Sequence, residues 1–514
     1  MKRIICLIIF IMTVIAVPSC NKETLPAEKK AEEKQEKNGT LTIYSLKDDT
    51  LCPIMTDNEA NKQLLSIIYE PLVELKTDMD ISGVLAESWS VSEDGLSWKI
   101  NIRKNVKWHN GELLSAEDVA YTVNQIKAVG NSIYSYNVRH IAEMEVTDMS
   151  IVMKLTEPCA NFMNLMTFPI MKRSDEEIDR VTYFPCGTGA YRLSDNISGN
   201  EYCLLRNENW WKGKAKLDKI NVKLLPDGDT VSYSFLSRDI DIANSKWGEK
   251  SITGGADVKT ISCPLSVYDY IGINHSVEGL KNTEVRRAID MAVNRMKITN
   301  DIFAGNATPA NIPLREEWFV YSGENNYEAD SLEAENLLLK NLWKKEDGVY
   351  SKEILDNKVK LEFEMIVNED NDRRVNIAEW IKTDIEAIGI KINIVKLPFE
   401  EYEERILSGD YQLFLGSTMI PDDLDLSYFF GEGNIFAYED ESLIGILEEI
   451  NLSRSKEDLV KNYEKMKNRF MVETPVVGIC FENFDMLYNK KVAGELNSTQ
   501  SNIYSGIYNL EIGK

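Results

Sequence analysis

Hydrophobic and polar residues alternate most clearly between Leu85 and Val123. Two short alternating runs, SWSVS and LSWKINIRK, flank Glu93-Asp94-Gly95, and a period of two predicts strands joined there by a tight turn. A second turn is predicted at Asn110-Gly111. Ser115 then precedes an amphipathic run, and Asp118 follows three residues later, which is typical of a helical capping box. The stretch therefore predicts a β-hairpin that leads into a helix.

In the last large segment of the chain, the hydrophobic pattern switches repeatedly between the two-residue period of a strand and the 3.6-residue period of a helix. The run LEFEMIVN predicts a strand, and an amphipathic helix ending at Gly389 follows it. IKINIV, FEEYEERILSG and YQLFLGS then predict a strand, a second helix and another strand. Alternating helices and strands are typical of an α/β arrangement. A chain of 514 residues exceeds a single hydrophobic core, so two or three domains are expected.

The first residues predict export rather than structure. Lys2 and Arg3 precede an apolar run, Ile4–Val17, which is short for a membrane span. The run ends in VPSC, which resembles a bacterial lipobox, so residues 1–20 are predicted to be a lipoprotein signal peptide with lipid attachment at Cys20. The alternative is a soluble secreted protein in which Cys20 is incidental. Residues 21–38 are almost wholly polar and predict a flexible tether, with a short solvated helix as the alternative.

Composition and charge exclude several classes of function. The 43% hydrophobic and 27% charged content is typical of a soluble globular protein. A formal net charge of −25 argues against nucleic acid as a partner, because its phosphates would be repelled. GxSxG, HExxH and phosphate-loop motifs are absent from the sequence, so we predict neither an enzyme nor a bound cofactor.

The sequence does not predict a metal site either. Its 3 histidines, His109, His140 and His275, lie far apart, and no cysteine pair has the CxxC spacing of a familiar zinc site. His109, in KWHNGE, is interpreted as a structural turn residue. The remaining cysteines can form disulfides outside the cell or stay as buried thiols, and these are Cys52, Cys159, Cys186, Cys203, Cys263 and Cys480.

Several motifs together resemble one known family. The run AESW…DGLSW…IRKNVKWHNGE…SAEDV, the segment CGTGAYRL, and the later motifs YIGIN and EVRRAI resemble the family 5 extracellular solute-binding proteins. These are receptors for oligopeptides, dipeptides or nickel that serve ATP-binding cassette (ABC) importers. The resemblance extends over about residues 40–514. The glycines of CGTGAYRL are expected to allow close packing of two backbone segments.

The resemblance implies a fold and a domain organisation. The expected fold is α/β, a two-lobed periplasmic-binding-protein-like class II fold of the larger cluster C type, with hinged lobes around a central cleft. The extra domain of the first lobe is expected at residues 83–186, and the second lobe at 277–475. The first lobe is expected to be discontinuous and to comprise residues 39–82, 187–276 and 476–514.

The resemblance also implies candidate ligand-binding residues. The strand that ends near Ala243 commonly delivers side chains to the cleft in this family, so Ser245 and Trp247 are candidates. Tyr270 and Asn274 correspond to positions near the crossover between lobes. The loop with Met55, Thr56 and Asp57 faces the cleft in the family and supplies weaker candidates, with a plain surface loop as the alternative.

The segment Gly416–Asp425 corresponds to the part of the family's sequence that recognises the amino terminus of a bound peptide. Peptide receptors of this family carry a Trp and then an Asp whose carboxylate accepts the α-ammonium group of the peptide. A gapless alignment places Ser417 at the Trp position and Ile420 at the Asp position. Asp422 or Asp423 can supply the carboxylate if the loop is shifted; otherwise the ligand has no free amino terminus.

We therefore predict a lipid-anchored receptor on the extracytoplasmic face of a bacterial membrane, which captures oligopeptides by lobe closure. Its expected partners are the ligand, the transmembrane permease subunits of an ABC importer and the membrane, and the receptor itself is expected to be a monomer. One alternative keeps the fold but binds a nickel complex, a sugar or another small polar molecule. Another is a peptide-sensing lipoprotein without transport.

Overall fold

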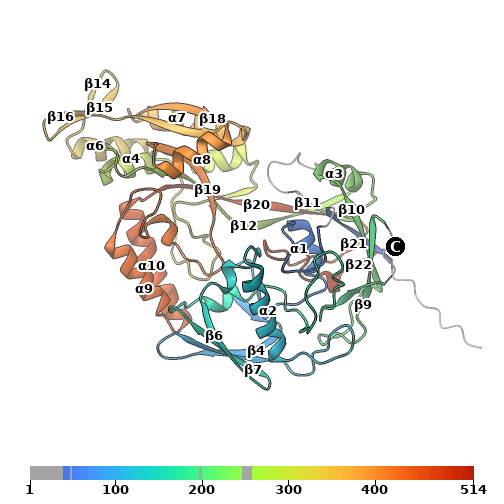
Figure 1. Cartoon of the computed structure of the whole chain (residues 1–514). Helices are drawn as coiled ribbons and strands as arrows, with labels where there is room; N and C mark the ends of the chain where they lie inside the picture. Colours follow the sequence, from blue (N-terminus) through green and yellow to red (C-terminus); the bar gives the residue numbers. More distant parts are fainter. Residues whose placement is uncertain (1–38, 47–48, 196–198, 246–256, 324, 514) are drawn as a thin grey trace, which may run out of the picture. The chain divides into compact units, whose positions relative to one another are not determined.

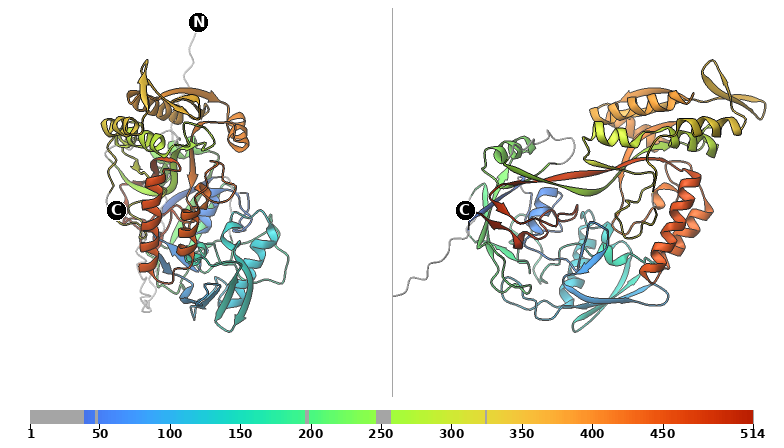
Figure 2. Two further views of the ribbon diagram at one scale, coloured as in Figure 1. Left: turned by 90° about the vertical axis from the view of Figure 1, so that its left-hand side faces the viewer. Right: turned by 180° about the vertical axis from the view of Figure 1, so that it is seen from behind.

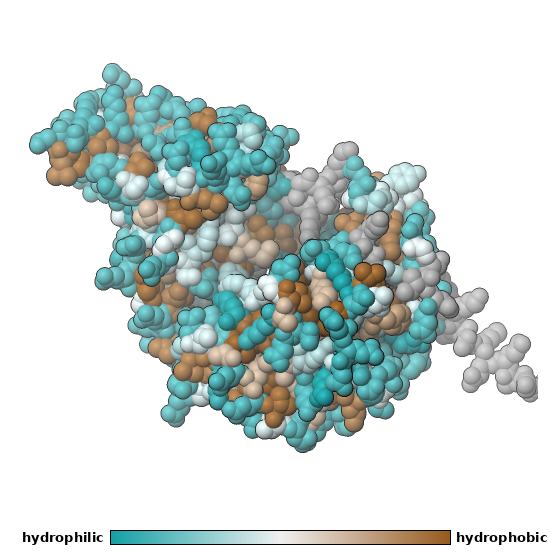
Figure 3. All heavy atoms as spheres, in the orientation of Figure 1, coloured by the Kyte–Doolittle hydropathy of each residue, from teal (hydrophilic) through white to brown (hydrophobic). Residues whose placement is uncertain are grey.

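The computed structural model describes residues 39–46, 49–195, 199–245, 257–323 and 325–513 (Figure 1). The predicted signal peptide, the predicted lipid attachment at Cys20 and the predicted tether at 21–38 lie outside these residues. Among the helices of the described part, none is long and apolar enough to cross a membrane. The face seen in Figure 3 is largely hydrophilic, with smaller hydrophobic patches between.

One four-stranded sheet has the order β1-β10-β9-β8. It consists of β1 (Leu41–Leu46), β10 (Lys219–Leu225), β9 (Glu201–Arg206) and β8 (Tyr191–Leu193). The first strand pairs in parallel with β10, and the other pairs are antiparallel. Alternate residues of β1 are buried, as its sequence pattern predicts, and Leu41 and Ile43 belong to the core below. Helix α1 (Glu59–Leu65) packs against β1, and α3 (Gly228–Leu236) follows β10.

A second, antiparallel sheet contains the predicted hairpin. Its order is β4 (Ala86–Val91), β5 (Ser97–Ile102), β7 (Ser150–Leu155) and β6 (Ile141–Thr147). Gly95 in the hairpin turn has a φ of 77°, which glycine adopts without strain. Helix α2 (Ala116–Val129) starts with the predicted capping box, in which the Ser115 N–H donates to Asp118 Oδ2 at 2.8 Å. The hairpin and its helix are thus confirmed.

The largest sheet joins distant parts of the chain. Along its main path the order is β11 (Ile242–Ser245), β20 (Val477–Asn489), β12 (Val258–Ile273), β19 (Leu413–Met419), β17 (Glu362–Asn368) and β18 (Lys391–Leu397), and β13 (Ala307–Pro309) pairs with β20. The pairs of β17 with β18 and β19 are parallel, as the predicted α/β alternation requires. Helix α7 (Asp372–Ala387) ends just before Gly389, whose φ is 82°.

The long strands β12 and β20 connect two hydrophobic cores. They pair antiparallel with each other, with a shift of register between Pro264 and Tyr268. Cys263 of β12 packs in the core around β1, whereas Ile271 belongs to the core that includes α4 (Thr283–Ala292) and α7. Figure 1 shows both strands running between these two groups of elements, and Figure 2 shows the same arrangement from two other sides.

The segment around Gly187 passes very close to another backbone segment, as its glycines predict. A Cβ atom on Gly187 would lie 1.9 Å from the carbonyl oxygen of Ile68, and one on Gly189 would lie 2.5 Å from that of Ile67. His109 holds the segment around Gly187 in position, because the Gly187 N–H donates to His109 Nδ1 at 3.2 Å. Burial lowers the pKa of His109 to about 4, so the ring is neutral and able to accept this bond. His109 therefore holds a turn.

The remaining elements complete the described body. Residues of the helices α9 (Glu441–Asn451) and α10 (Lys456–Glu473) pack with an aromatic cluster that includes Tyr270, Phe414, Phe429 and Phe436. The elements are α5 (Arg295–Lys297), α6 (Ser331–Lys340), α8 (Phe399–Ser408), α9 (Glu441–Asn451), α10 (Lys456–Glu473), β2 (Val73–Leu75), β3 (Ile81–Gly83), β14 (Lys344–Glu346), β15 (Val349–Ile354), β16 (Asn357–Lys360), β21 (Val492–Ala493) and β22 (Glu511–Ile512).

The predicted domain boundaries stay a proposal. All four strands of the β4-β5-β7-β6 sheet fall within residues 83–186, the range expected for the extra domain. The expected first lobe contains β12 and β20, but β12 also pairs with β19 of the expected second lobe. One sheet therefore continues across the expected boundary between lobes.

Candidate ligand-binding site

A cavity of about 790 Å³ is formed by segments from both ends and the middle of the chain. Its walls include α1, the segment 75–79, the segment 133–137, the strands β12 and β20, and the loop after β19. A smaller cavity of about 160 Å³ adjoins it and shares Lys62, Asn137, Asp422 and Tyr504 with it. Because the two strands that connect the cores also line the cavity, bending of these strands would change its width.

The cavity combines apolar walls with a few charges, which is typical of a pocket for a small ligand. Its apolar lining includes Leu75, Met79, Trp318 and Phe484. Basic and acidic groups both face it, and they are Glu59, Lys62, Lys76, Asp422 and Glu482. A ligand with both a positive and a negative end could be matched by such a lining.

Asp422 is the acidic residue of the cavity lining whose carboxylate lacks a salt-bridge partner within the described residues. Burial raises the pKa of Asp422 to about 6, with Lys62 opposing the rise and Asp423 adding to it. The Thr167 side chain also opposes the rise. Among the described lysines, arginines and histidines, none forms a salt bridge with Asp422. A cationic group entering the cavity would therefore stabilise the ionised carboxylate.

Glu482, on β20, is a second partly buried acid of the cavity wall, and it does have a partner. Its carboxylate lies 3.2 Å from Arg373 Nη1. Burial raises the pKa of Glu482, and burial together with the neighbouring Glu482 raises the pKa of Asp269 to about 7. Asp269 of β12 and Glu482 of β20 lie where these strands pair, and Glu482 lines the cavity.

The structure brings only part of the predicted site to the cavity. Asp422 lines it. Ser245 ends β11 beside the lining residue Asn244 but does not line the cavity itself. Ser417 is half-buried on β19, where Arg374 Nη2 donates to its hydroxyl oxygen at 2.5 Å. Trp247 lies outside the described residues.

Tyr270 and Asn274 lie away from the cavity lining. Tyr270 is 1% exposed and packs within the aromatic cluster, where its hydroxyl lies 2.9 Å from that of Tyr428. Asn274 Nδ2 donates to the carbonyl oxygens of Gly409, at 3.1 Å, and Tyr411, at 2.8 Å. Both side chains serve packing and loop anchoring in this structure, because the end of β12 is enclosed by neighbouring strands and loops.

Asp423 faces a different environment from Asp422. Its Oδ2 accepts from Arg139 Nη2 at 2.5 Å, and the Tyr136 hydroxyl donates to its Oδ1 at 3.2 Å. The weaker candidates Met55, Thr56 and Asp57 do not line the cavity, and the Thr56 hydroxyl donates to Asp49 at 2.7 Å. Ile420, the aligned position, is 1% exposed and buried in a hydrophobic core.

Several lining residues were not predicted from the sequence. Lys62 and Gln63 belong to α1, and Trp318 and Glu482 lie in segments without a motif. Tyr136 and Asn137 come from the segment before β6. Helix α1, with the sequence EANKQLL, is polar at most of its positions, so its pattern did not single out Lys62 and Gln63.

Comparison with known proteins places the chain in a family. The model of the bacterial extracellular solute-binding proteins, family 5 (middle), matches residues 80–435. The oligopeptide-binding protein AppA of Bacillus subtilis is 22% identical, with 98% of each chain covered. The glutathione-binding protein GsiB of Salmonella typhi is 27% identical over 51% of this chain and 53% of its own.

Solved structures share the fold at low sequence identity. The nickel ABC transporter protein of Bacillus halodurans has a TM-score of 0.79 at 20% identity, and 92% of this chain and 100% of that chain are covered. The predicted α/β, two-lobed fold is thereby confirmed, and a binding protein rather than an enzyme is what the family match supports. The chain belongs to the family 5 bacterial extracellular solute-binding proteins.

Proposed function

We propose that this protein is an oligopeptide receptor in which Asp422 accepts the α-ammonium group of the bound peptide. The observation that carries the proposal is a partly buried carboxylate that lines a cavity of about 790 Å³ and has no salt bridge within the described residues. An ammonium group that leaves water needs a charge-assisted partner, or its desolvation costs several kcal/mol. The similarity to the oligopeptide-binding protein AppA supports a peptide as the ligand.

The rest of the lining suits a peptide as well. Lys62 and Lys76 face the same cavity and can attract a terminal carboxylate, while the apolar walls accommodate side chains. Buried water can fill the space that short side chains leave, which permits varied sequences. The cavity thus offers charge recognition for the ends of a peptide and little restriction between them.

The proposal also covers how the receptor is anchored, which partner it serves and how its lobes close. Cys20 carries the lipid, residues 21–38 form the tether, and the receptor presents its ligand as a monomer to the transmembrane subunits of an ABC importer. The lobes close by joint bending of β12 and β20. Support for this setting comes from the family match and from the two strands that line the cavity.

Native mass spectrometry of the chain purified gently from its own cells tests the proposal. We expect a heterogeneous set of co-purified masses that correspond to short peptides. The Asp422→Asn variant should lose these masses, whereas Asp57→Asn, an exposed acid outside the cavity lining, should retain them. A single discrete non-peptide mass, or peptides retained by Asp422→Asn, would contradict the proposed role.

A second candidate keeps the site and changes the ligand to a nickel complex or another small polar solute. The structural similarity to a nickel ABC transporter protein favours it. A metal complex with carboxylate groups would interact with Lys62 and Lys76 rather than Asp422. Binding of such a complex that survives Asp422→Asn would distinguish it from a peptide.

A further inference from the structure

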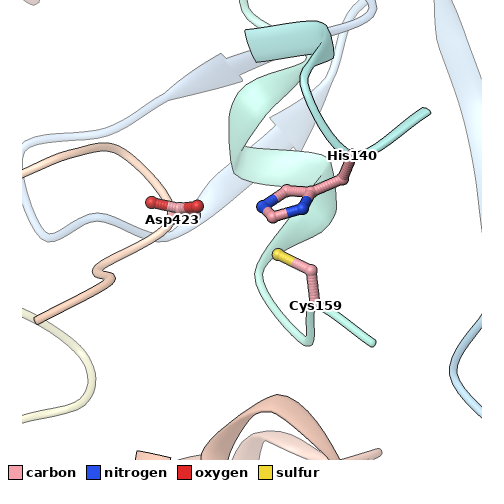
Figure 4. A group of neighbouring side chains, drawn as sticks. All are labelled: His140, Cys159 and Asp423. Atoms are coloured by element: carbon pink, nitrogen blue, oxygen red, sulfur yellow. The ribbon is translucent and has the colours of Figure 1, made fainter. Parts of the chain in front are cut away.

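Three side chains from distant parts of the sequence meet outside the cavity lining. A nitrogen of His140, Cys159 Sγ and a carboxylate oxygen of Asp423 lie within 4.8 Å of one another. Figure 4 shows the three side chains pointing toward a common centre. We propose that His140, Cys159 and Asp423 form a binding site for a divalent transition-metal ion such as Zn²⁺.

The chemistry of the ligand atoms selects the class of metal. Imidazole and thiolate are ligands for zinc and similar ions, whereas calcium and magnesium prefer oxygen atoms alone. Three protein ligands leave a fourth tetrahedral position for water. Ligand atoms around a tetrahedral zinc lie roughly 3.5 Å apart, so the side chains would have to move together by about 1 Å.

His140 is already oriented for this role. Its Nδ1 lies 3.1 Å from Glu157 Oε1, which leaves Nε2 for the metal. A carboxylate on the second ring nitrogen is a common support for a metal-binding histidine. The Thr156 N–H donates to the carbonyl oxygen of His140 at 2.8 Å, so the histidine and the segment that carries Glu157 and Cys159 are held together.

The charges and burial of the site favour a cation. Cys159 and Asp423 are both 5% exposed, so few water molecules compete for their ligand atoms. Burial and Arg139 lower the pKa of His140, so the imidazole is neutral at pH 7. Burial raises the pKa of Cys159, so binding must release the thiol proton to solvent. Arg139 opposes the cation, but Asp423, Glu157 and the new thiolate outweigh its single charge.

The site links the loop after β19 to a neighbouring sheet. His140 and Cys159 flank the sheet of β6 and β7, whereas Asp423 lies in the loop after β19, next to the lining residue Asp422. A bound metal would therefore fix this loop to that sheet. The site is separate from solute binding, because none of its three residues lines the cavity.

Titration of the purified, reduced chain with Co²⁺ and Zn²⁺ alone tests the site. We expect one equivalent of Co²⁺ with a thiolate-to-metal absorption band, and displacement of Co²⁺ by Zn²⁺. Cys159→Ser should abolish the band, and His140→Ala should weaken binding at least ten-fold. Cys263→Ser is the matched control, because Cys263 is also a buried thiol at 5% exposure, and it should leave the band unchanged.

Glu157→Gln provides a test that does not depend on a buried substitution, because the Glu157 side chain is 65% exposed. It should weaken Co²⁺ binding by about ten-fold, the usual effect of removing such a support. No stoichiometric binding, a band that persists in Cys159→Ser, or an unchanged affinity in Glu157→Gln would overturn the proposal. Since no solute enters these measurements, failure here leaves the proposed peptide function untouched.

Discussion

Asp422 and Asp423 are neighbours in the chain, but their carboxylates have opposite surroundings. Asp423 is held by Arg139 at 2.5 Å, whereas Asp422 lines the cavity and has no salt bridge within the described residues. The pair therefore divides two tasks between adjacent positions: Asp423 joins two segments of the protein, and Asp422 remains available to a ligand.

The affinity for a peptide with a free amino terminus should depend on pH. An ammonium group stabilises ionised Asp422, so its pKa is lower in the complex than the value of about 6 in the free protein. Affinity should be constant above about pH 6 and fall by up to ten-fold per pH unit below it. Calorimetry between pH 4.5 and 8 measures this. An N-acetylated peptide should bind weakly at every pH, and equal affinities for both peptides would contradict the assignment.

Asp422→Asn should stabilise the ligand-free protein at neutral pH. The folded protein raises the pKa of this acid from 3.8 to about 6, so the cost of ionising it in the folded state appears as pH rises through this interval. Each pKa unit corresponds to about 1.4 kcal/mol, so the gain is roughly 2 to 3 kcal/mol above pH 6. Denaturant unfolding at pH 7.5 should show it. At pH 3.5, where the folded state is protonated and the unfolded state mostly so, the gain should nearly vanish.

Breaking the pair of Arg139 and Asp423 should destabilise the protein. The Asp423 side chain is 2% exposed, so Arg139→Gln leaves a buried carboxylate without its cation. The expected loss of unfolding free energy is about 3 kcal/mol. The double variant Arg139→Gln/Asp423→Asn should recover part of this loss, because no buried charge remains. Additive effects in the double-mutant cycle would show that the two groups do not interact.

Gly187→Ala should be among the most damaging single-methyl additions. Its Cβ atom would lie 1.9 Å from a backbone oxygen of Ile68, which cannot move as a flexible side chain can. We expect a loss of several kcal/mol or failure to fold. Gly445→Ala is the control, since this glycine lies in α9 with nothing within 4 Å of the added atom. That change should be neutral or stabilise the helix by up to about 1 kcal/mol, as thermal unfolding would show.

Local patterns predicted the elements well, because their causes lie within a few residues. The turn at Gly95, the cap formed by Ser115 and Asp118, and the helix end at Gly389 each depend on neighbours in sequence. The cavity depends on residues that are distant in sequence, such as Lys62, Trp318 and Glu482. No pattern of hydrophobicity or spacing could bring these together, and the same holds for His140, Cys159 and Asp423.

The family resemblance predicted more of the binding site than the sequence patterns did. It predicted which positions in the chain lie near the ligand, but not what surrounds their side chains. It pointed to the loop after β19, where Asp422 does line the cavity. It also pointed to Tyr270 and Asn274, which the structure encloses in packing and loop contacts. The aligned Ile420 is buried in a core, two residues before the carboxylate that faces the cavity.

The pairing of β12 with β20 limits how the proposed closing motion can proceed. Hydrogen bonds join the two strands from Val258 to Ile271, so neither can slide or bend without the other. The shift of register between Pro264 and Tyr268 interrupts this ladder beside the cavity-lining residues 264–267. A bend there would move both strands together, and a pair of fluorophores on the two sides would report it.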